Sequence, residues 1–247
     1  MSDSSATFTD LVQSFTTFLT VAIHTILYER HIYPATSFLS ARKYNYAVRQ
    51  SRHPRVCEWI TDAVAAVEAE MLKCTVDRIA VVIFDRNDQP LERFMFDVSR
   101  LPTVPAQELN TPMQRLDDQG SELPILPGGD LEEQYRASMS RLSGCGSGLK
   151  DIPEGCTFTV AVELKDESEP PLGEPQPWIP AQPGLQKTVR SEPGNVRVER
   201  GDQLKGVRTI PVRTIAAGEM TFEMWIEEGK TKFQPTVADA SSEGEHE

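Results

Sequence analysis

The sequence predicts an α/β domain of the α+β kind, in which three helices accompany a sheet that contains a hairpin. In three stretches, apolar residues recur every three or four positions, the period of a helix with one buried face. Residues 78–98 hold two apolar runs joined by turn residues, as in a hairpin. Residues 156–164 and the last third of the chain contain segments typical of strands. At 247 residues with 39% hydrophobic residues, the chain can bury a core.

The first helix is expected to begin at Phe8 and to stop near Tyr33 and Pro34. Its apolar face comprises Phe8, Leu11, Val12, Phe15, Phe18, Leu19, Ala22, Ile23, Ile26 and Leu27. His24 and His31 are interpreted as helix-surface residues, because no cysteine or carboxylate pattern accompanies them.

The second helix is expected to open at His53 and Pro54, because proline suits the first helical turn. Its stripe comprises Val56, Ile60, Ala63, Val64, Val67, Met71 and Leu72. Trp59 falls beside this stripe. The third helix carries Leu131, Tyr135, Ser138, Met139 and Leu142 and is ended by glycines.

The hairpin consists of IAVVIFD, the turn RNDQP and LERFMFDV. The continuous apolar run of its first strand indicates a central strand covered on both faces. CTFTVAVEL alternates strictly, and further short strands are expected around VRVE, VRTIPVRTI and EMTFEMWIEE. In the last of these, Met220 to Ile226 supply an apolar face, whereas Trp225 lies on the polar face with Glu223.

The charge balance argues against direct nucleic-acid binding. With 25 Lys+Arg against 37 Asp+Glu, the net charge of −12 would repel a phosphate backbone. One segment, SARKYNYAVRQSRH, interleaves cations with Tyr44 and Tyr46, a pattern that can bind single strands by stacking. The alternative, which we favour, is a short strand and loop whose cations balance an acidic protein.

Catalytic, metal-binding and membrane classes find no support in the sequence. The cysteines, Cys57, Cys74, Cys145 and Cys156, form no C-x-x-C pair, and the four histidines form no cluster with them. No cofactor, metal or enzymatic activity is therefore expected. No apolar run approaches the roughly 20 residues of a membrane span, and the N-terminus lacks the features of a secretory signal. We expect an intracellular protein.

Three segments are expected to lack a fixed structure or to be loops. Residues 101–130 are rich in proline and glycine without periodicity, which predicts a flexible insertion. The stretch KDESEPPLGEPQPWIPAQPG cannot hold regular structure. Residues 234–247 contain four acids and no lysine or arginine, which predicts a disordered acidic tail.

The order of these elements, together with seven local motifs, resembles the HORMA family, and within it the accessory subunits of translesion DNA polymerase zeta. The motifs are AIHTILYERHIYP, RKYN, HP, VVIFDRNDQPLERFMF, PEGCTFTVAV, PWI and WIEE. The resemblance implies a single three-layer domain over residues 1–233 with a central, mostly antiparallel sheet. It also implies that residues 165–233 form a safety belt, a segment that wraps around an extended peptide of a partner.

The partners that the resemblance implies are proteins. A proline-containing peptide of the polymerase zeta catalytic subunit would lie beneath the belt, and a separate surface would recruit the C-terminal domain of the translesion scaffold polymerase. The implied role is translesion synthesis and DNA damage tolerance, in the nucleus and secondarily the cytoplasm. Two such domains would also pair, through Arg136, Arg141 and Ser147. Thr209, Glu223 and Trp225 match the scaffold-polymerase surface.

The implied peptide-binding residues are Trp59, Trp178, Ile179 and Pro180. A proline ring gains burial between two aromatic planes at little cost in conformational entropy. Ordinary core packing is the alternative for Trp59, and a loop anchor is the alternative for Trp178. Pro180 departs from the family, which has a larger apolar residue there. Ser147 departs likewise from a small apolar residue.

Two other functions remain open. A spindle-checkpoint or meiotic-axis HORMA adaptor would bind a closure-motif peptide and would be distinguished by the peptide that copurifies with it. An enzyme is the less favoured alternative, because no cluster of nucleophile, base or metal ligand is recognisable.

Overall fold

The computed structural model describes residues 6–165, 178, 188–192, 195–199 and 206–233, and the statements below concern these residues. The helices are α1 (Phe8–Glu29), α2 (Pro54–Met71) and α3 (Gly128–Ser143). The strands are β1 (Phe38–Lys43), β2 (Tyr46–Ser51), β3 (Val76–Phe84), β4 (Pro90–Asp97), β5 (Arg115–Leu116), β6 (Glu122–Leu123), β7 (Thr157–Leu164), β8 (Thr188–Glu192), β9 (Asn195–Glu199), β10 (Gly206–Ala217) and β11 (Met220–Gly229). Short 3-10 turns are η1 (Ala35–Ser37), η2 (Ala106–Glu108), η3 (Cys145–Gly148) and η6 (Lys230–Phe233).

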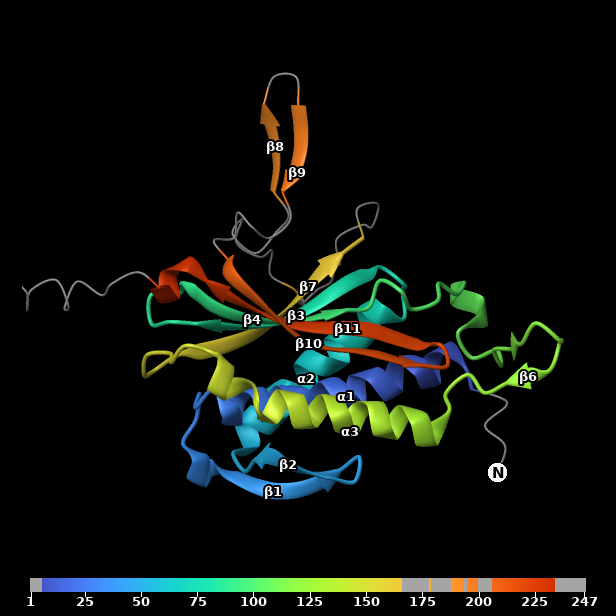
Figure 1. The fold of residues 1–247 in the computed structure, drawn as a ribbon, viewed down its shortest axis with the longest axis horizontal. Coiled ribbons are helices and arrows are strands. Elements are labelled where there is room, and N and C mark those ends of the chain that lie inside the picture. The colour runs from blue at the N-terminus through green and yellow to red at the C-terminus, as the bar shows by residue number, and fades with distance from the viewer. Residues whose placement is uncertain (1–5, 166–177, 179–187, 193–194, 200–205, 234–247) are drawn as a thin grey trace, which may run out of the picture.

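The elements form three layers, as predicted. A five-stranded sheet lies on one side, the three helices pack beneath it, and the β1–β2 hairpin lies under the helices (Figure 1). The strand order is β10-β11-β4-β3-β7, and every neighbouring pair is antiparallel. The predicted hairpin is β3–β4, and Asp85 stabilises its turn by accepting hydrogen bonds from the backbone N–H groups of Asn87 and Gln89 at 2.8 Å. Strands β7 and β10 lie at opposite edges of the sheet.

Helix α1 is the centre of the core. It begins with a capping box between Thr7 and Asp10. The Thr7 hydroxyl accepts a hydrogen bond from the backbone N–H of Asp10, and the Asp10 carboxylate accepts one from the backbone N–H of Thr7. Phe15 and Phe18 pack against Phe222 of β11 with ring centroids 5.0 and 5.4 Å apart, and Phe18 stacks on Tyr135 of α3 at 4.6 Å. By length and composition α1 could cross a membrane, but 67% of its most apolar window is buried within the domain.

His24 corrects one expectation from the sequence. Its side chain is buried (6% exposed) and does not lie on the helix surface, because α1 packs against α2, α3 and β2 as well as against Phe222 of the sheet. Its Nδ1 accepts the backbone N–H of Ser51 at 3.3 Å, and burial lowers the pKa of the imidazole. The residue therefore joins α1 to the β1–β2 hairpin.

The basic segment forms a hairpin, whereas the sequence predicted one short strand and a loop. Tyr44 and Asn45 form its turn with φ of +53° and +51°, the positive values that a two-residue type I′ turn requires at both positions. The ring of Tyr44 faces inward, 4.9 Å from the ring of Tyr135. The ring is half-buried there, which leaves less of it available to stack on a base.

Strand β3 is covered on both faces, as its continuous apolar run predicted. Ile79, Val81 and Ile83 face the helices. Ala80 and Val82 face the other side, where a smaller cluster with Met95 buries them beneath Trp225, Phe84 and Ala161. Among the described residues, side chains of the sheet itself supply this second cover.

Residues 101–130 contain η2 and the β5–β6 ribbon, and they contact the domain at both ends. The backbone N–H of Thr9 donates to Leu109 O at 3.2 Å, and that of Glu219 donates to Ile125 O at 2.9 Å. The flexibility of this insertion stays a prediction. The expected acidic tail, residues 234–247, lies outside the described residues.

Candidate functional site

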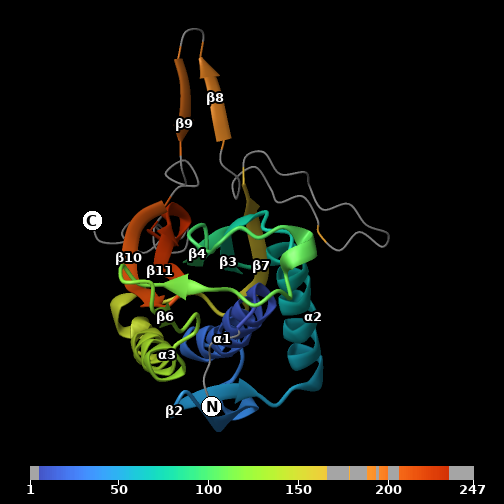
Figure 2. The ribbon, with the colours of Figure 1, turned by 90° about the vertical axis from the view of Figure 1, so that its right-hand side faces the viewer.

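The outer edge of β7 is not paired with any strand that the structure describes. Within the described ranges β7 pairs with β3 alone, so the N–H and C=O groups along its other side meet no described strand. Such an edge can add an extended peptide as a further strand, with main-chain hydrogen bonds giving affinity. Helix α2 lies on the β7 side of the molecule, whereas α3 lies on the β10 side (Figure 2). Side chains of α2 are therefore available beside this edge.

Three aromatic rings meet at the β7 edge. Trp59 of α2 packs edge-on against Phe158 of β7 with ring centroids 4.8 Å apart, and the ring of Tyr33 lies 6.5 Å from that of Phe158, also edge-on. Trp59 is 40% exposed, so it is not a core residue, and its contact with Phe158 keeps it from being fully exposed to solvent. Phe158 and Tyr33 were not predicted as site residues. The signal was present in the motifs YERHIYP and GCTFTVAV, but only the fold brings the two together.

The other predicted peptide-binding residues are only partly described. Trp178 is half-buried and packs against the main hydrophobic core, as either a loop anchor or a binding residue would. Ile179 and Pro180 lie outside the described residues. A proline clamp between Trp59 and Trp178 therefore stays a prediction.

The residues expected to pair two domains do not form one cluster. Arg136 lines a hollow of about 550 Å³ between α3 and the tip of the β1–β2 hairpin, together with Lys43, Tyr44 and Glu132. Arg141 is exposed in the last turn of α3. Ser147 lies beyond that helix in η3, where its hydroxyl donates to Gly144 O at 3.0 Å. Pairing through these residues stays a prediction.

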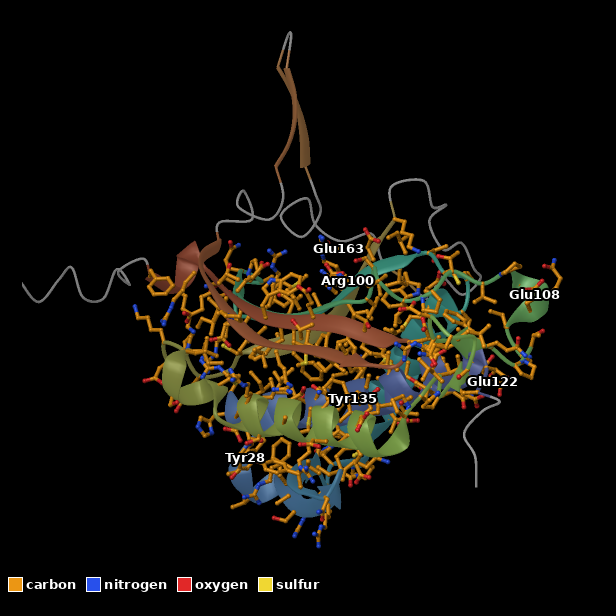
Figure 3. The ribbon with its side chains drawn as sticks, turned by 45° about the vertical axis from the view of Figure 1, so that its right-hand side comes forward. Tyr28, Arg100, Glu108, Glu122, Tyr135 and Glu163 are labelled. Carbon is orange, nitrogen blue, oxygen red and sulfur yellow. The ribbon has the colours of Figure 1, made fainter. Side chains whose placement is uncertain are left out.

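The residues expected to contact the scaffold polymerase share one face of the sheet. Thr209 lies opposite Glu227 in the β10–β11 register, so it projects to the same side as Trp225 and Glu223. Trp225 covers Ala80, Val82 and Met95 with one part of its ring, and its Nε1 donates to Glu227 Oε1 at 2.7 Å. The half-exposed Glu223 pairs with Arg100 at 3.0 Å. Figure 3 shows Arg100 on the opposite side of the sheet from Tyr135 and the helices.

The titratable groups of the described residues form no cluster typical of a metal site. Within the residues that the structure describes, no three His, Cys, Asp or Glu side chains gather as a metal site would require. The four cysteines are free and half-buried. Burial raises the pKa of the Cys145 thiol to about 12, so it stays protonated at neutral pH and is a poor nucleophile.

Comparisons with known proteins agree with this geometry. The family model described as the HORMA domain matches residues 12–197. A relative from Schizosaccharomyces pombe, the DNA polymerase zeta processivity subunit, is 33% identical over 87% of this chain and 92% of its own length. The Bos taurus mitotic spindle assembly checkpoint protein MAD2B is 29% identical over 85% of this chain and 87% of its own.

Two solved structures show the same fold at low sequence identity. A chain of the mitotic checkpoint complex superposes with a TM-score of 0.60 at 18% identity, covering 88% of this chain and 98% of that one. Caenorhabditis elegans HTP-1, bound to the HIM-3 closure motif, gives a TM-score of 0.52 at 13% identity, with 92% and 98% covered. The matched family model and the 33% identical relative together show that this chain belongs to the HORMA domain family.

Proposed function

We propose that this chain is a non-catalytic adaptor that traps a proline-containing peptide of the DNA polymerase zeta catalytic subunit along the β7 edge. It would bridge this subunit to the translesion scaffold polymerase and so support translesion synthesis and damage tolerance, mainly in the nucleus. The name of the fission yeast relative supports the choice of partner. The closure-motif title of the HTP-1 structure supports a peptide as the ligand of this fold.

The observation that carries the proposal is the half-exposed Trp59 beside the outer side of β7, which pairs with no strand within the described residues. A peptide strand paired with β7 would pass within reach of the Trp59 and Phe158 rings, which stand 75° to each other. Proline suits such a place, because its ring has apolar faces and it lacks the N–H group that an outward-facing position on an edge strand leaves unused.

The chain connectivity supports enclosure of the peptide. Because β7 and β10 lie at opposite edges, the residues between Lys165 and Gly206 have to connect positions separated by four strand spacings, about 19 Å. A connection of this kind that starts at the β7 edge can cross a strand added to that edge. We propose this crossing as the safety belt, with Trp178, Ile179 and Pro180 over the peptide.

A tiled peptide array tests the proposal. Overlapping 20-residue peptides from the polymerase zeta catalytic subunit of the same organism are screened, and the tile that binds is titrated by calorimetry. We expect Trp59→Ala to weaken binding by roughly 2 kcal/mol, about 30-fold in Kd, and Trp178→Ala to do the same. Trp225→Ala is the matched control, since it removes a tryptophan from a strand outside the peptide site and should leave the affinity unchanged. Wild-type affinity in folded Trp59→Ala would contradict the placement.

The spindle-checkpoint or meiotic-axis adaptor is the second candidate, because a MAD2B relative and closure-motif complexes share this fold. Affinity purification from the native cell separates the two. Recovery of a checkpoint receptor or an axis protein, with no polymerase subunit, would favour the second candidate. Microscopy of the tagged protein during the same experiment tests the nuclear location.

A further inference from the structure

Four charged side chains are buried where the C-terminal hairpin β10–β11 meets the rest of the domain. They are Arg30 at the end of α1, Glu92 of β4, Glu228 of β11 and Lys232 of η6. Each of these side chains is 4% exposed or less. Charged residues are seldom fully buried unless they are paired, so the stability of this cluster depends on the ion pairs and hydrogen bonds among its members.

The pairing is nearly complete. Arg30 binds Glu92 with two parallel hydrogen bonds of 2.8 Å and donates a third, also 2.8 Å, to the carbonyl of Lys150. Lys232 contacts Glu92 Oε1 and lies 2.6 Å from Glu228 Oε1. The backbone N–H of Lys150 donates to the same Glu228 oxygen at 3.0 Å. One ammonium group therefore connects two carboxylates that come from different strands.

The strand register makes the ammonium group necessary. Glu228 lies directly opposite Glu92 in the β11–β4 ladder, and like charges at such positions destabilise a sheet. Lys232 relieves this repulsion only while β11 is paired with β4, because its partners lie on both strands. Pairing of the hairpin and ordering of η6 consequently depend on each other.

The surroundings offer little to replace Lys232. Glu228 Oε2 is buried and accepts no hydrogen bond from the described residues, and the guanidinium of the half-exposed Arg208 lies 3.6 Å from it. Arg30 already donates through Nε and Nη2 to Glu92 and to the carbonyl of Lys150. Without Lys232, the cluster would keep two negative charges and one positive charge inside the domain, and Arg208 at its rim is the one further cation that the described side chains place within 4 Å of these carboxylates.

We propose that Arg30, Glu92, Glu228 and Lys232 form a latch, a set of positioning residues that fixes β10–β11 on β4 and so determines how long a captured peptide stays bound. The part concerning the peptide rests on the proposed function. If the segment after β7 encloses a peptide, its far end is anchored by β10 and β11. Release would then require the hairpin to separate from β4, and the latch lies at the end of the hairpin where β10 begins and β11 ends.

Two measurements on the full chain test the latch independently of each other. Hydrogen exchange of the peptide-free protein reports opening of the β11–β4 ladder, with the β3–β7 ladder as the internal reference. The dissociation rate of the fluorescein-labelled tile that binds in the array reports the lifetime of the complex. Both are measured on Lys232→Met. They are repeated on Lys232→Met/Glu228→Gln, which removes one charge of each sign and leaves the Arg30–Glu92 pair intact.

The control variant is Arg78→Met. Arg78 is mostly buried and pairs with Asp97 and Glu163 at 2.9 and 3.0 Å, at the opposite end of β4 from Glu92. Its loss removes a cation from two carboxylates of the same sheet without touching the latch. A general loss of stability would therefore appear in this variant as well.

For Lys232→Met we expect at least tenfold faster exchange in residues 223–228 with unchanged exchange in β3 and β7, and at least tenfold faster dissociation of the tile. The double variant should show the same selectivity with a smaller effect. Arg78→Met should leave the tile's dissociation rate and the exchange of residues 226–228, which lie at the end of the ladder away from Asp97, within twofold of wild type. Unchanged exchange in both Lys232 variants, or equal acceleration in β3 and β7, would overturn the latch. If no tile binds the wild type, the proposed function and the claim about peptide lifetime both fail. Faster exchange confined to β11 in the Lys232 variants would still support the part of the proposal in which the latch holds β10–β11 on β4.

Discussion

The buried hydroxyl of Tyr44 allows a test of how the packing at the β1–β2 hairpin contributes to stability. This oxygen is buried and has no hydrogen-bond partner among the described residues, and burial raises the pKa of Tyr44 because the charged form is desolvated. The neighbouring Tyr135 differs in one respect, since its hydroxyl shares a 3.1 Å hydrogen bond with Ser14. The two rings lie 4.9 Å apart, so the pair provides a matched comparison within one cluster.

The expected magnitudes follow from these two oxygens. A buried hydroxyl without a partner costs about 1–3 kcal/mol, so Tyr44→Phe should increase the free energy of unfolding by about 1 kcal/mol or more. Tyr135→Phe removes a satisfied hydrogen bond and should lower that free energy by about 1 kcal/mol. Both variants keep the rings that pack on Phe18, so the packing contribution is nearly constant.

Urea unfolding followed by circular dichroism measures both variants against wild type. In a chain of this length, 1 kcal/mol corresponds to about 2–4 °C in Tm, so a thermal scan gives a second estimate. A Tyr44→Phe variant that is no more stable than wild type would refute the reasoning. It would mean that the hydroxyl is satisfied in solution.

Two further predictions concern the hairpin β10–β11. Trp225→Ala should weaken binding of the scaffold polymerase's C-terminal domain by roughly 2 kcal/mol in calorimetry and leave binding of the catalytic-subunit peptide unchanged. Unchanged binding of both partners would show that the Trp225 ring does not contact the scaffold polymerase. The same substitution should also lower stability, because Ala80, Val82 and Met95 lose their cover. Gly218→Ala should lower the free energy of unfolding by more than about 1 kcal/mol, because φ is +64° and a Cβ would lie 2.1 Å from Ile125 O. Gly148→Ala, with nothing within 4 Å, is its control, and equal urea midpoints for the two would contradict the close contact.

The sequence predicted those parts of the fold that repeat with a local period. Helix α1, the β3–β4 hairpin and the alternation of β7 follow from spacing alone, and strand parity put Trp225 on the correct face. His24 was misplaced because a helix covered on two sides buries polar residues outside its apolar stripe. The β1–β2 turn was missed because Tyr-Asn is a weaker turn signal than Asn-Gly.

The latch lay beyond what spacing can predict. Lys232 and Glu92 are 140 residues apart, and Arg30 and Glu92 are 62 apart. Charged residues are usually solvated, so each one taken alone predicts a surface position. Similarly, Trp59 could be placed beside a stripe, but its contact with Phe158 required the sheet. Only the fold supplies such pairings.

The position of α1 at the centre of the core has a consequence for how the protein is made. Its Phe15 packs on Phe222, about 200 residues later in the chain, and contacts of such long sequence separation slow folding. At a synthesis rate of about 5–20 residues per second, roughly 10–40 s separate the emergence of these two rings from the ribosome. Throughout that interval the nascent chain exposes a 22-residue helix that is apolar enough to cross a membrane. A chaperone that shields this segment until β11 has been synthesised would therefore raise the yield of folded protein.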